Sequence, residues 1–322
     1  MNVYLTFDIE VWCNGWSQLD QNFPGSFERY VYGASRSDGY ALPKTLQILQ
    51  RHGLRGVFFV EPLFSARFGS QHLKTITDLI LDAGQDVQLH LHPEWTDEIQ
   101  PGIIDDCQRK RQHLTYYTLQ EQAALIAFGK ARLQEATGRP VTAFRAGSFA
   151  ANRDTFRALA HNGIFIDSSL NESFDHSGGT LPSPNRWRPQ DRIDGVDTYP
   201  VTVFSDGFGR PRAAQVGSCS FAELRDALLS AQAAGCPHFV LVSHNFEMLK
   251  SGSTAPDPIV AARFEQLCMF LAAHPQRFSV GAFGGGRPGN EAPTMDGSLP
   301  RPGATVWSTT RRHAEQLARR AL

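Results

Sequence analysis

Residues 3–10 read Val-Tyr-Leu-Thr-Phe-Asp-Ile-Glu, a short β-type run that ends in two acidic residues. Side chains along a strand alternate between its two faces, so Asp8 and Glu10 face the same way. Two carboxylates held together repel each other, and the pKa of one would rise unless a cation lies between them. The stretch therefore predicts either a cation site at a strand end or, as the plainer alternative, an acidic pair that faces solvent.

The rest of the chain alternates strand patterns with helical patterns. Further strands are predicted at residues 56–60, 86–91, 141–145, 164–167, 198–204 and 239–243, with 279–283 as a candidate for a last one. Helices are predicted at residues 42–52, 73–83, 119–137, 153–162, 221–234 and 258–273. Such alternation indicates parallel strands joined by crossover helices. About seven such units favour an α/β barrel over an open sheet.

Three segments follow from this pattern. Residues 1–283 are predicted to form the α/β domain, residues 284–308 a Gly/Pro-rich linker, and residues 309–322 a short basic amphipathic helix or a mobile tail. Within the domain, the segment from Ser168 to Asp197 lacks periodicity and is rich in Ser, Gly, Pro and Asn. Long loops of this kind inside compact domains tend to be functional.

The composition excludes several classes of protein. A formal net charge of −1 gives no general attraction to nucleic acid or to anionic membranes, and no run of residues is apolar enough to span a membrane. The five cysteines are scattered and form no CxxC pair, which argues against a disulfide framework or a thiolate zinc site. No secretory signal is recognisable, so a cytoplasmic location is expected. The oligomeric state is not predicted.

Ionisable residues collect where the predicted strands end, which is where parallel α/β barrels carry their functional groups. These residues are Asp8 and Glu10, then His90, His92 and Glu94, then Arg145, Asp167 and His244. Five strands would thus bring ionisable side chains to one rim.

The His90 and His92 side chains share a face by the period-two rule, and Glu94 continues the series. With a carboxylate from the first strand they would form a His/His/carboxylate ligand set that suits Zn²⁺ and also other divalent ions. The predicted metal ligands are Glu10, His90, His92 and Glu94, and the most suitable metal is Zn²⁺. A surface histidine pair beside a turn proline is the alternative.

The remaining polar residues are candidates for catalysis. Arg145 could pair with Asp8 and keep it ionised, or it could be an anchoring salt bridge. His244 is either catalytic or structural, and its position on the same rim favours catalysis. Asp167 is a candidate to orient His244 or to bind sugar hydroxyls.

Tryptophans in neighbouring loops could stack on a sugar ring, or they could cover the rim of the core. They are Trp12, Trp95 and Trp187.

In their order along the chain, these motifs resemble those of the polysaccharide deacetylase family of metal-dependent carbohydrate esterases. The resemblance covers residues 1–283. Thr6-Phe7-Asp8 is similar to the opening Thr-Phe-Asp-Asp motif, residues 87–92 to the metal-binding histidine motif, residues 144–147 to the arginine motif, and residues 241–244 to the motif that carries the catalytic histidine. Asp167 falls where the family has an aspartate-bearing segment. The resemblance implies a distorted, incomplete barrel with fewer than eight strands.

The sequence departs from the family pattern at two points. The second aspartate of the opening motif is Ile9 here, and Glu10 is its natural substitute. The two histidines of the metal motif are normally spaced i and i+4, but position 94 is glutamate. Either His92 or Glu94 then completes the ligand set. The chain is therefore similar to a divergent branch associated with cell-surface polysaccharide biosynthesis.

The resemblance implies hydrolysis of an N-acyl group, most simply acetyl, from an amino sugar of a polysaccharide, glycolipid or sugar precursor. Asp8 would act as general base, Arg145 would hold it ionised, His244 would protonate the leaving amine, and a backbone N–H near Ser148 would stabilise the oxyanion. Two other readings remain open. One is a hydrolase of other C–N bonds, and the other is a degenerate protein that only binds glycans.

Overall fold

The structure is a computed structural model that describes residues 1–34, 36, 39–105, 107–174, 181, 191–283 and 299–321. Its strands are β1 (Asn2–Ile9), β2 (Gly56–Val60), β3 (Asp86–Leu91), β4 (Ala143–Ala146), β5 (Ile166–Asp167), β6 (Asp191–Ile193), β7 (Val196–Thr198), β8 (Val203–Ser205), β9 (Pro211–Ala213), β10 (His238–His244) and β11 (Ser279–Val280). Its α-helices are α1 (Leu19–Val31), α2 (Leu42–Arg51), α3 (Phe64–Phe68), α4 (Ser70–Asp82), α5 (Leu119–Thr137), α6 (Arg153–His161), α7 (Phe221–Ala233), α8 (Pro258–Ala273) and α9 (Val306–Ala321). Short 3₁₀ helices are η1 (Pro93–Glu98), η2 (Leu114–Tyr116) and η3 (Gly147–Phe149).

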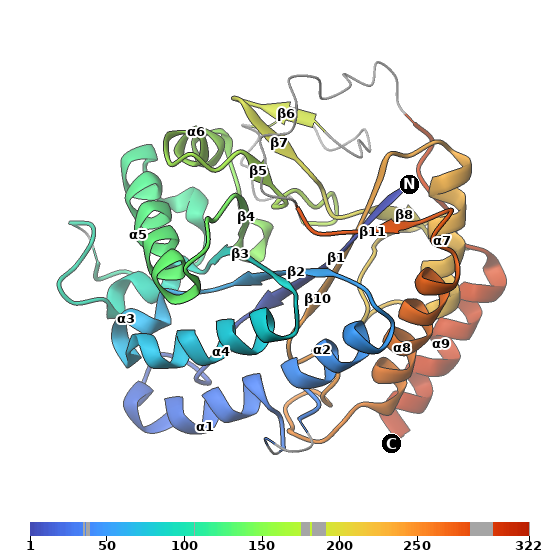
Figure 1. The fold of residues 1–322 in the computed structure, drawn as a ribbon, viewed down its shortest axis with the longest axis horizontal. Coiled ribbons are helices and arrows are strands. Elements are labelled where there is room, and N and C mark those ends of the chain that lie inside the picture. Colours follow the sequence, from blue (N-terminus) through green and yellow to red (C-terminus); the bar gives the residue numbers. More distant parts are fainter. Residues whose placement is uncertain are drawn as a thin grey trace.

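The main sheet is curled, open and mostly parallel, with the strand order β10-β1-β2-β3-β4-β5-β7-β6. Among the strands that the structure describes in this sheet, only β6 runs antiparallel to its neighbour, and β11 pairs in parallel with the start of β1. Helices such as α2, α4, α5 and α8 lie around the outside of the curled sheet (Figure 1). The described strands thus form a half-barrel, and the expected distorted, incomplete α/β barrel is confirmed.

The alternation of side chains along β1 separates two environments. Val3, Leu5 and Phe7 belong to the large apolar core, which also includes residues of the surrounding helices. Tyr4 packs on the other face, in a smaller cluster that includes Phe59 and Phe283. Thr6, Asp8 and Glu10 continue the series of Tyr4 and are buried. The period-two rule therefore carries both acidic residues to the concave face of the half-barrel.

The edge strand β10 is covered by irregular chain. Thr202 N–H donates to the Val240 carbonyl oxygen at 3.0 Å, and Val242 N–H donates to the Ala214 carbonyl oxygen at 3.0 Å. The Val216 N–H also donates to the Val242 carbonyl oxygen at 3.3 Å. An uncovered edge would present unpaired backbone groups to other chains, and these bonds remove that hazard.

Two local differences from the sequence prediction have physical causes. Helix α1 was not expected, because Pro24 and Gly25 interrupt its helical pattern, yet Leu19, Phe23 and Phe27 bury one face of it. The strand expected at residues 198–204 is split. The segment that contains Pro200 separates β7 from β8, and β8 pairs with β9 in a separate two-stranded sheet.

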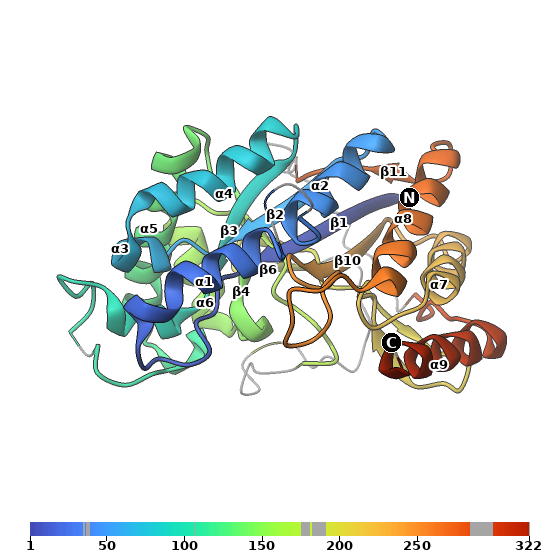
Figure 2. The ribbon, with the colours of Figure 1, turned by 90° about the horizontal axis from the view of Figure 1, so that it is seen from below.

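Helix α9 packs along α7 at one end of the molecule (Figures 1 and 2). The Arg312 guanidinium is buried and donates to Glu223 at 2.9 Å and to Asp206 at 3.3 Å. The chain just before the helix is also held, because Gly303 pairs with Ser205. Residues 284–298 of the predicted linker lie outside the described residues.

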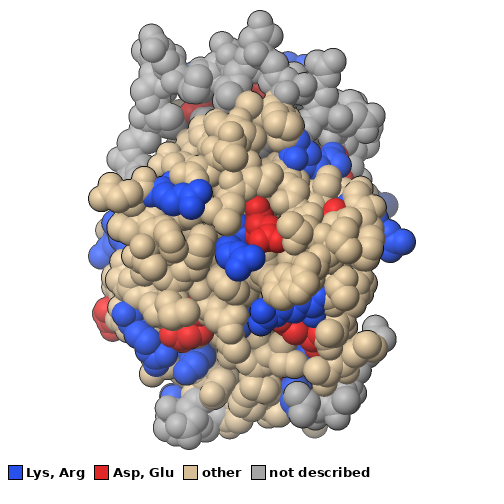
Figure 3. All heavy atoms as spheres, turned by 90° about the vertical axis from the view of Figure 1, so that its right-hand side faces the viewer, with Lys and Arg blue, Asp and Glu red and all other residues tan. Residues whose placement is uncertain are grey.

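The face seen in Figure 3 carries Lys and Arg side chains interspersed with Asp and Glu. It therefore has no continuous basic area among the residues drawn in colour. None of the described helices combines the length and apolar composition that a membrane span requires.

Replacing Arg312 tests how firmly α9 is attached. In Arg312→Met, Glu223 and Asp206 stay buried without their cation, so we expect a loss of about 3–5 kcal/mol in the free energy of unfolding. The matched control is Arg311→Met, because Arg311 is its neighbour and its contacts, an ion pair with Glu315 and a cation–π contact with Trp307, lie on the surface. That control should cost under about 0.5 kcal/mol. Urea denaturation measures both, and equal effects would contradict the argument.

Candidate metal centre and active site

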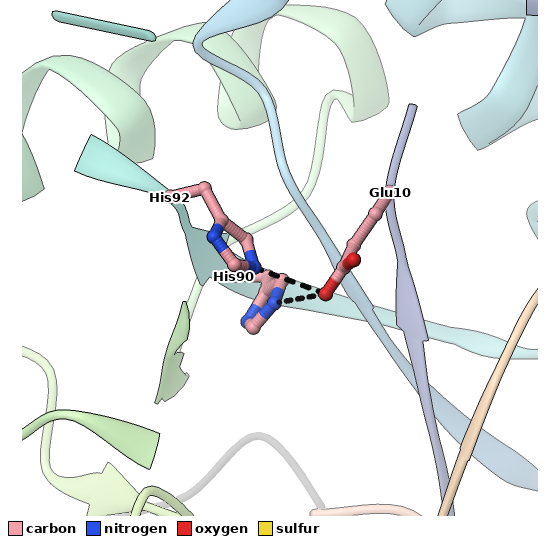
Figure 4. Close-up of side chains that lie close together, drawn as sticks. All are labelled: Glu10, His90 and His92. Atoms are coloured by element: carbon pink, nitrogen blue, oxygen red, sulfur yellow. Dashed lines mark hydrogen bonds and ion pairs between the residues drawn. The ribbon is translucent and has the colours of Figure 1, made fainter. Parts of the chain in front are cut away.

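Three side chains converge on the concave face of the sheet. Oε1 of Glu10 lies 3.1 Å from Nε2 of His90 and 3.0 Å from Nε2 of His92 (Figure 4). The ligand atoms of the three residues all lie within 4.8 Å of one another. Glu10 is 8% exposed, His90 1% and His92 5%. The alternatives of a solvent-facing acidic pair and of a surface histidine pair are therefore wrong.

The hydrogen bond on the far side of the His90 ring decides which of its nitrogens carries the proton. Nδ1 of His90 lies 2.8 Å from the Arg145 carbonyl oxygen, which can only accept, so Nδ1 carries the proton. A neutral His90 would then point an Nε2 lone pair at a carboxylate oxygen. That arrangement is repulsive unless a positive charge lies between the two atoms.

The pKa shifts of His92 and Glu10 arise because burial is outweighed by the attraction between the carboxylates and the imidazoles. Burial alone would lower the pKa of His92, but Glu10 and Glu94 raise it well above its ordinary value. Burial likewise disfavours the charged form of Glu10, while His92 and His90 hold its pKa well below the usual range. The cluster thus favours a negative carboxylate beside a cation. Two neutral imidazoles and one carboxylate are a suitable donor set for a divalent metal.

Glu94 lies outside the cluster. Its Oε2 is 3.3 Å from Nδ1 of His92, on the opposite edge of the ring from Nε2. Carboxylates in this position commonly fix the orientation and tautomer of a metal-binding histidine. The structure therefore brings together three of the four predicted ligands, with Glu94 behind His92.

Trp12 contacts the cluster directly. Its Nε1–H donates to Oε2 of Glu10 at 2.6 Å, and its ring meets His92 edge-on at 4.7 Å. Trp12 was predicted to contact substrate, and its observed contacts hold Glu10 and His92. Gly147 covers the other side of His92, since a Cβ at this position would lie 2.7 Å from the ring.

Asp8 and Arg145 form a buried pair next to the cluster. Nη1 of Arg145 donates to Oδ1 of Asp8 at 2.7 Å, and Nη2 donates to Oγ1 of Thr6 at 2.8 Å. Ser168 accepts two more hydrogen bonds, through its carbonyl oxygen and its hydroxyl. The guanidinium also lies 4.5 Å from the ring of Phe59. The backbone carbonyl oxygen of Arg145 also accepts a hydrogen bond from His90, so Arg145 connects the pair to the candidate metal ligands.

His244 stands at the end of β10, facing Asp8. Its Nε2 is 4.0 Å from Oδ2 of Asp8, and its Nδ1 is 2.8 Å from Oε1 of Glu247. Burial lowers the pKa of His244, but the hydrogen bond to Glu247 and the charges of Glu10, Glu247 and Asp8 raise it to about 9. The imidazole is therefore set up to hold a proton near Asp8.

Asp167 is fully buried and makes its contacts away from His244. Its carboxylate accepts from the Ser169 backbone N–H at 2.9 Å and from the Ser169 hydroxyl at 2.5 Å. Burial raises the pKa of Asp167 to about 7, against the effect of these bonds and of Arg145. Glu247, and not Asp167, is hydrogen-bonded to His244.

A cavity of about 540 Å³ opens beside His244, and Ser148, Phe149, Asn171 and Phe174 help to line it. Ser148 and Phe149 have φ values of 54° and 55°, a left-handed conformation that is rare for a bulky residue. Such strain often marks a functional site. Asn171 is buried at the cavity wall, and among the described residues its Nδ2 has no hydrogen-bond partner.

The other tryptophans do not line the described part of this cavity. Trp95 is 1% exposed and packs edge-on against Trp16 in the core, so it cannot stack on a ligand as predicted. It instead covers the rim of the core. Trp187 lies outside the described residues.

Sequence reasoning missed Glu247, Asn171 and Phe149. Glu247 follows His244 by three residues, so the turn after a strand that ends in histidine was an available signal. Asn171 lies in the aperiodic segment already identified as functional. Nothing in the sequence marks Phe149, because its position depends on the unusual backbone of η3.

No family model of protein sequences matches the chain, and no curated protein matches it. Solved structures do match. A Mycobacterium smegmatis protein assigned as a polysaccharide deacetylase is 20% identical, with 87% of this chain and 86% of that chain covered and a TM-score of 0.56.

Two further matches are more distant. A family 4 carbohydrate esterase from Streptomyces lividans is 15% identical, with 88% of this chain and 93% of that chain covered and a TM-score of 0.43. A carbohydrate esterase family 4 pseudoenzyme from Bacillus anthracis is 12% identical, with 86% and 62% covered and a TM-score of 0.42. At the TM-score of the Mycobacterium smegmatis protein, the resemblance to polysaccharide deacetylases is confirmed for the fold.

The close contact of Gly147 with His92 gives a test of the metal centre. In Gly147→Ala the new Cβ must displace the His92 ring, so we expect affinity for Zn²⁺ to fall about 10- to 100-fold. A competitive titration against a chromogenic chelator measures this. The control is Gly25→Ala, where a Cβ meets nothing within 4 Å. Unchanged affinity in Gly147→Ala would remove His92 from the ligand set.

Proposed function

We propose that the protein is a metal-dependent hydrolase that removes an N-acyl group, most simply acetyl, from an amino sugar. The observation that carries this proposal is the buried Glu10–His90–His92 cluster, joined through Arg145 to Asp8 and His244. The shared fold with a polysaccharide deacetylase supports the same reaction class.

The donor set suits Zn²⁺, because two imidazoles and one carboxylate leave positions open for water and substrate. A divalent metal held by Glu10, His90 and His92 would supply Lewis acidity, which lowers the pKa of water and polarises an acyl carbonyl. Glu94 and Trp12 would keep His92 and Glu10 in place during turnover.

Asp8 acts as general base in this proposal. Its Oδ1 accepts a hydrogen bond from the Arg145 guanidinium, which leaves Oδ2 to accept a proton from water. Oδ2 is also the oxygen nearest to His244. Asp8 as the base and His244 as the acid thus face each other, with 4.0 Å between Oδ2 and Nε2.

His244 acts as general acid and protonates the departing amine. Glu247 accepts from Nδ1, which directs the proton on Nε2 toward the region of Asp8. Positioned acid–base groups each contribute about 10²- to 10⁴-fold in rate.

The cavity beside His244 fits a sugar. The Phe149 and Phe174 rings are stacked with centroids 5.9 Å apart, and Phe174 is 50% exposed, so an apolar sugar face can pack there. Asn171 offers an amide donor to a hydroxyl or carbonyl oxygen. Backbone N–H groups near Ser148 are candidates to stabilise the oxyanion.

Metal removal tests the proposal directly. Protein stripped with a chelator should lose amine release from N-acetylated amino sugars and recover it when Zn²⁺ is restored. His244→Gln should keep stoichiometric metal and lose about 10²- to 10⁴-fold in kcat, since it removes only the proton donor. Primary-amine detection and metal analysis are the two measurements.

The outcomes separate the competing functions. Protein without bound metal and without turnover would point to a degenerate glycan-binding protein. Turnover of small cyclic amides but not of N-acyl sugars would point to a hydrolase of other C–N bonds. Normal turnover in His244→Gln would remove this histidine from the mechanism.

The role of Glu247 predicts a pH effect. The acid works only when protonated, so kcat/KM falls as the pH rises through the pKa of His244. In Glu247→Gln the ring loses the carboxylate that raises its pKa, and the alkaline limb should move to lower pH. Glu265→Gln on the surface of α8 is the control and should not shift the profile. An unmoved limb in Glu247→Gln would contradict the assigned roles.

A further inference from the structure

A second cavity of about 490 Å³ shares His244 and Gln215 with the cavity described above. Three cationic residues from distant parts of the chain line it: Arg29 in the last turn of α1, Lys250 in the loop after β10, and Arg319 near the end of α9. Glu247 is the one carboxylate among the described residues that line it. Asp257 balances the charge of Arg319, so the excess of positive charge in the lining rests chiefly on Arg29.

The carboxylates at this cavity are already bound. Glu247 accepts from His244, from the Gln215 side chain at 2.6 Å and from the Gly217 N–H at 2.6 Å. Asp257, at the start of α8, accepts from Arg319 at 2.7 Å. Neither carboxylate is left to attract a cation or to balance a further positive charge.

Arg29 provides the clearest uncompensated charge. Within the part of the chain that the structure describes, no carboxylate lies within ion-pair distance of its guanidinium, which sits 5.3 Å from the Tyr30 ring. The residue is half-buried at the cavity wall. A half-buried guanidinium beside a cavity favours an anionic ligand, because arginine binds phosphate and carboxylate groups with paired hydrogen bonds.

We propose that this cavity binds an anionic group, a phosphate or a carboxylate, carried by the substrate. The inference rests on the proposed function and deepens it: the substrate is an anionic N-acyl amino sugar derivative rather than a neutral glycan. The two cavities share His244, so a sugar in one can extend its charged group into the other while its amide lies near the acid. Ser251 and Ser253 line the same wall and offer hydroxyl donors.

Binding to the full-length, metal-loaded protein gives a measure of the site that is separate from its catalytic activity. Isothermal titration calorimetry would compare N-acetylglucosamine, its 1-phosphate and its 6-carboxylate form, so that the last two distinguish the source of the charge. We expect at least one anionic sugar to bind about tenfold or more tightly than the neutral one, as one charged hydrogen bond allows. Added NaCl should reduce that preference.

Two variants and a control connect the preference to this cavity. Arg29→Gln should reduce the anionic-over-neutral affinity ratio about tenfold, and Lys250→Gln is a second variant with an expected reduction in the same direction. Arg139→Gln is the control, because Arg139 is exposed and precedes β4, at the opposite end of the strands from His244. It should leave the ratio unchanged.

Equal binding of charged and neutral sugars would overturn the anion site. A preference that survives both Arg29→Gln and Lys250→Gln would overturn it as well, since the anion would then bind elsewhere, for example at the metal. Failure of the proposed function looks different: the preference and its dependence on Arg29 would persist, but no amine would be released from any of the three sugars. Amine release without a charge preference would leave the deacetylase proposal standing alone.

Discussion

The arrangement of the site depends on one buried cation, Arg145. Its side chain is fully buried, and a guanidinium in such a place is tolerated only when its N–H groups are hydrogen-bonded and its charge is balanced. Asp8 balances the charge, while Thr6 and Ser168 accept the other hydrogen bonds. The Thr6 hydroxyl donates a hydrogen bond to the Leu241 carbonyl oxygen of β10, and the Ser168 hydroxyl donates one to the Tyr199 carbonyl oxygen. Through Thr6 and Ser168, this side chain thus links β4 to β1 and β10 on one side and to the segment that follows β7 on the other.

The same residue also limits what the histidines can do. The Arg145 carbonyl oxygen fixes the proton of His90 on Nδ1, so Nε2 is left facing Glu10. A buried carboxylate that faces an imidazole lone pair is costly unless a cation joins them. The hydrogen bond to the Arg145 carbonyl oxygen therefore helps to orient His90 as a donor to a divalent cation. Arg145 thus holds Asp8, the proposed general base, through its side chain and His90, a candidate metal ligand, through its backbone carbonyl.

The sequence predicted the regular parts of the fold because they depend on local periodicity. Helices α5 and α8 have the expected bounds, and Gly138 ends α5 in the left-handed conformation as a stop signal should. The convergence of strand ends could also be predicted, since parallel strands place their carboxyl ends at one rim. Contacts made by loops could not: the burial of Trp95 and the pairing of Glu247 with His244 depend on tertiary packing that no spacing encodes.

One segment of the chain, around residues 214–217, both covers the open edge of the half-barrel and supports His244, the proposed general acid. An incomplete barrel leaves β10 with a free edge, and the chain around Ala214 and Val216 covers it with backbone hydrogen bonds. That cover places Gln215 and Gly217 beside Glu247, and both donate to its carboxylate. A Cβ at Gly217 would lie 2.6 Å from Oε2 of Glu247, so a side chain there would displace the carboxylate. The segment that protects the edge therefore also positions the carboxylate that holds His244, so that loss of the cover would affect both the edge of the sheet and the orientation of His244.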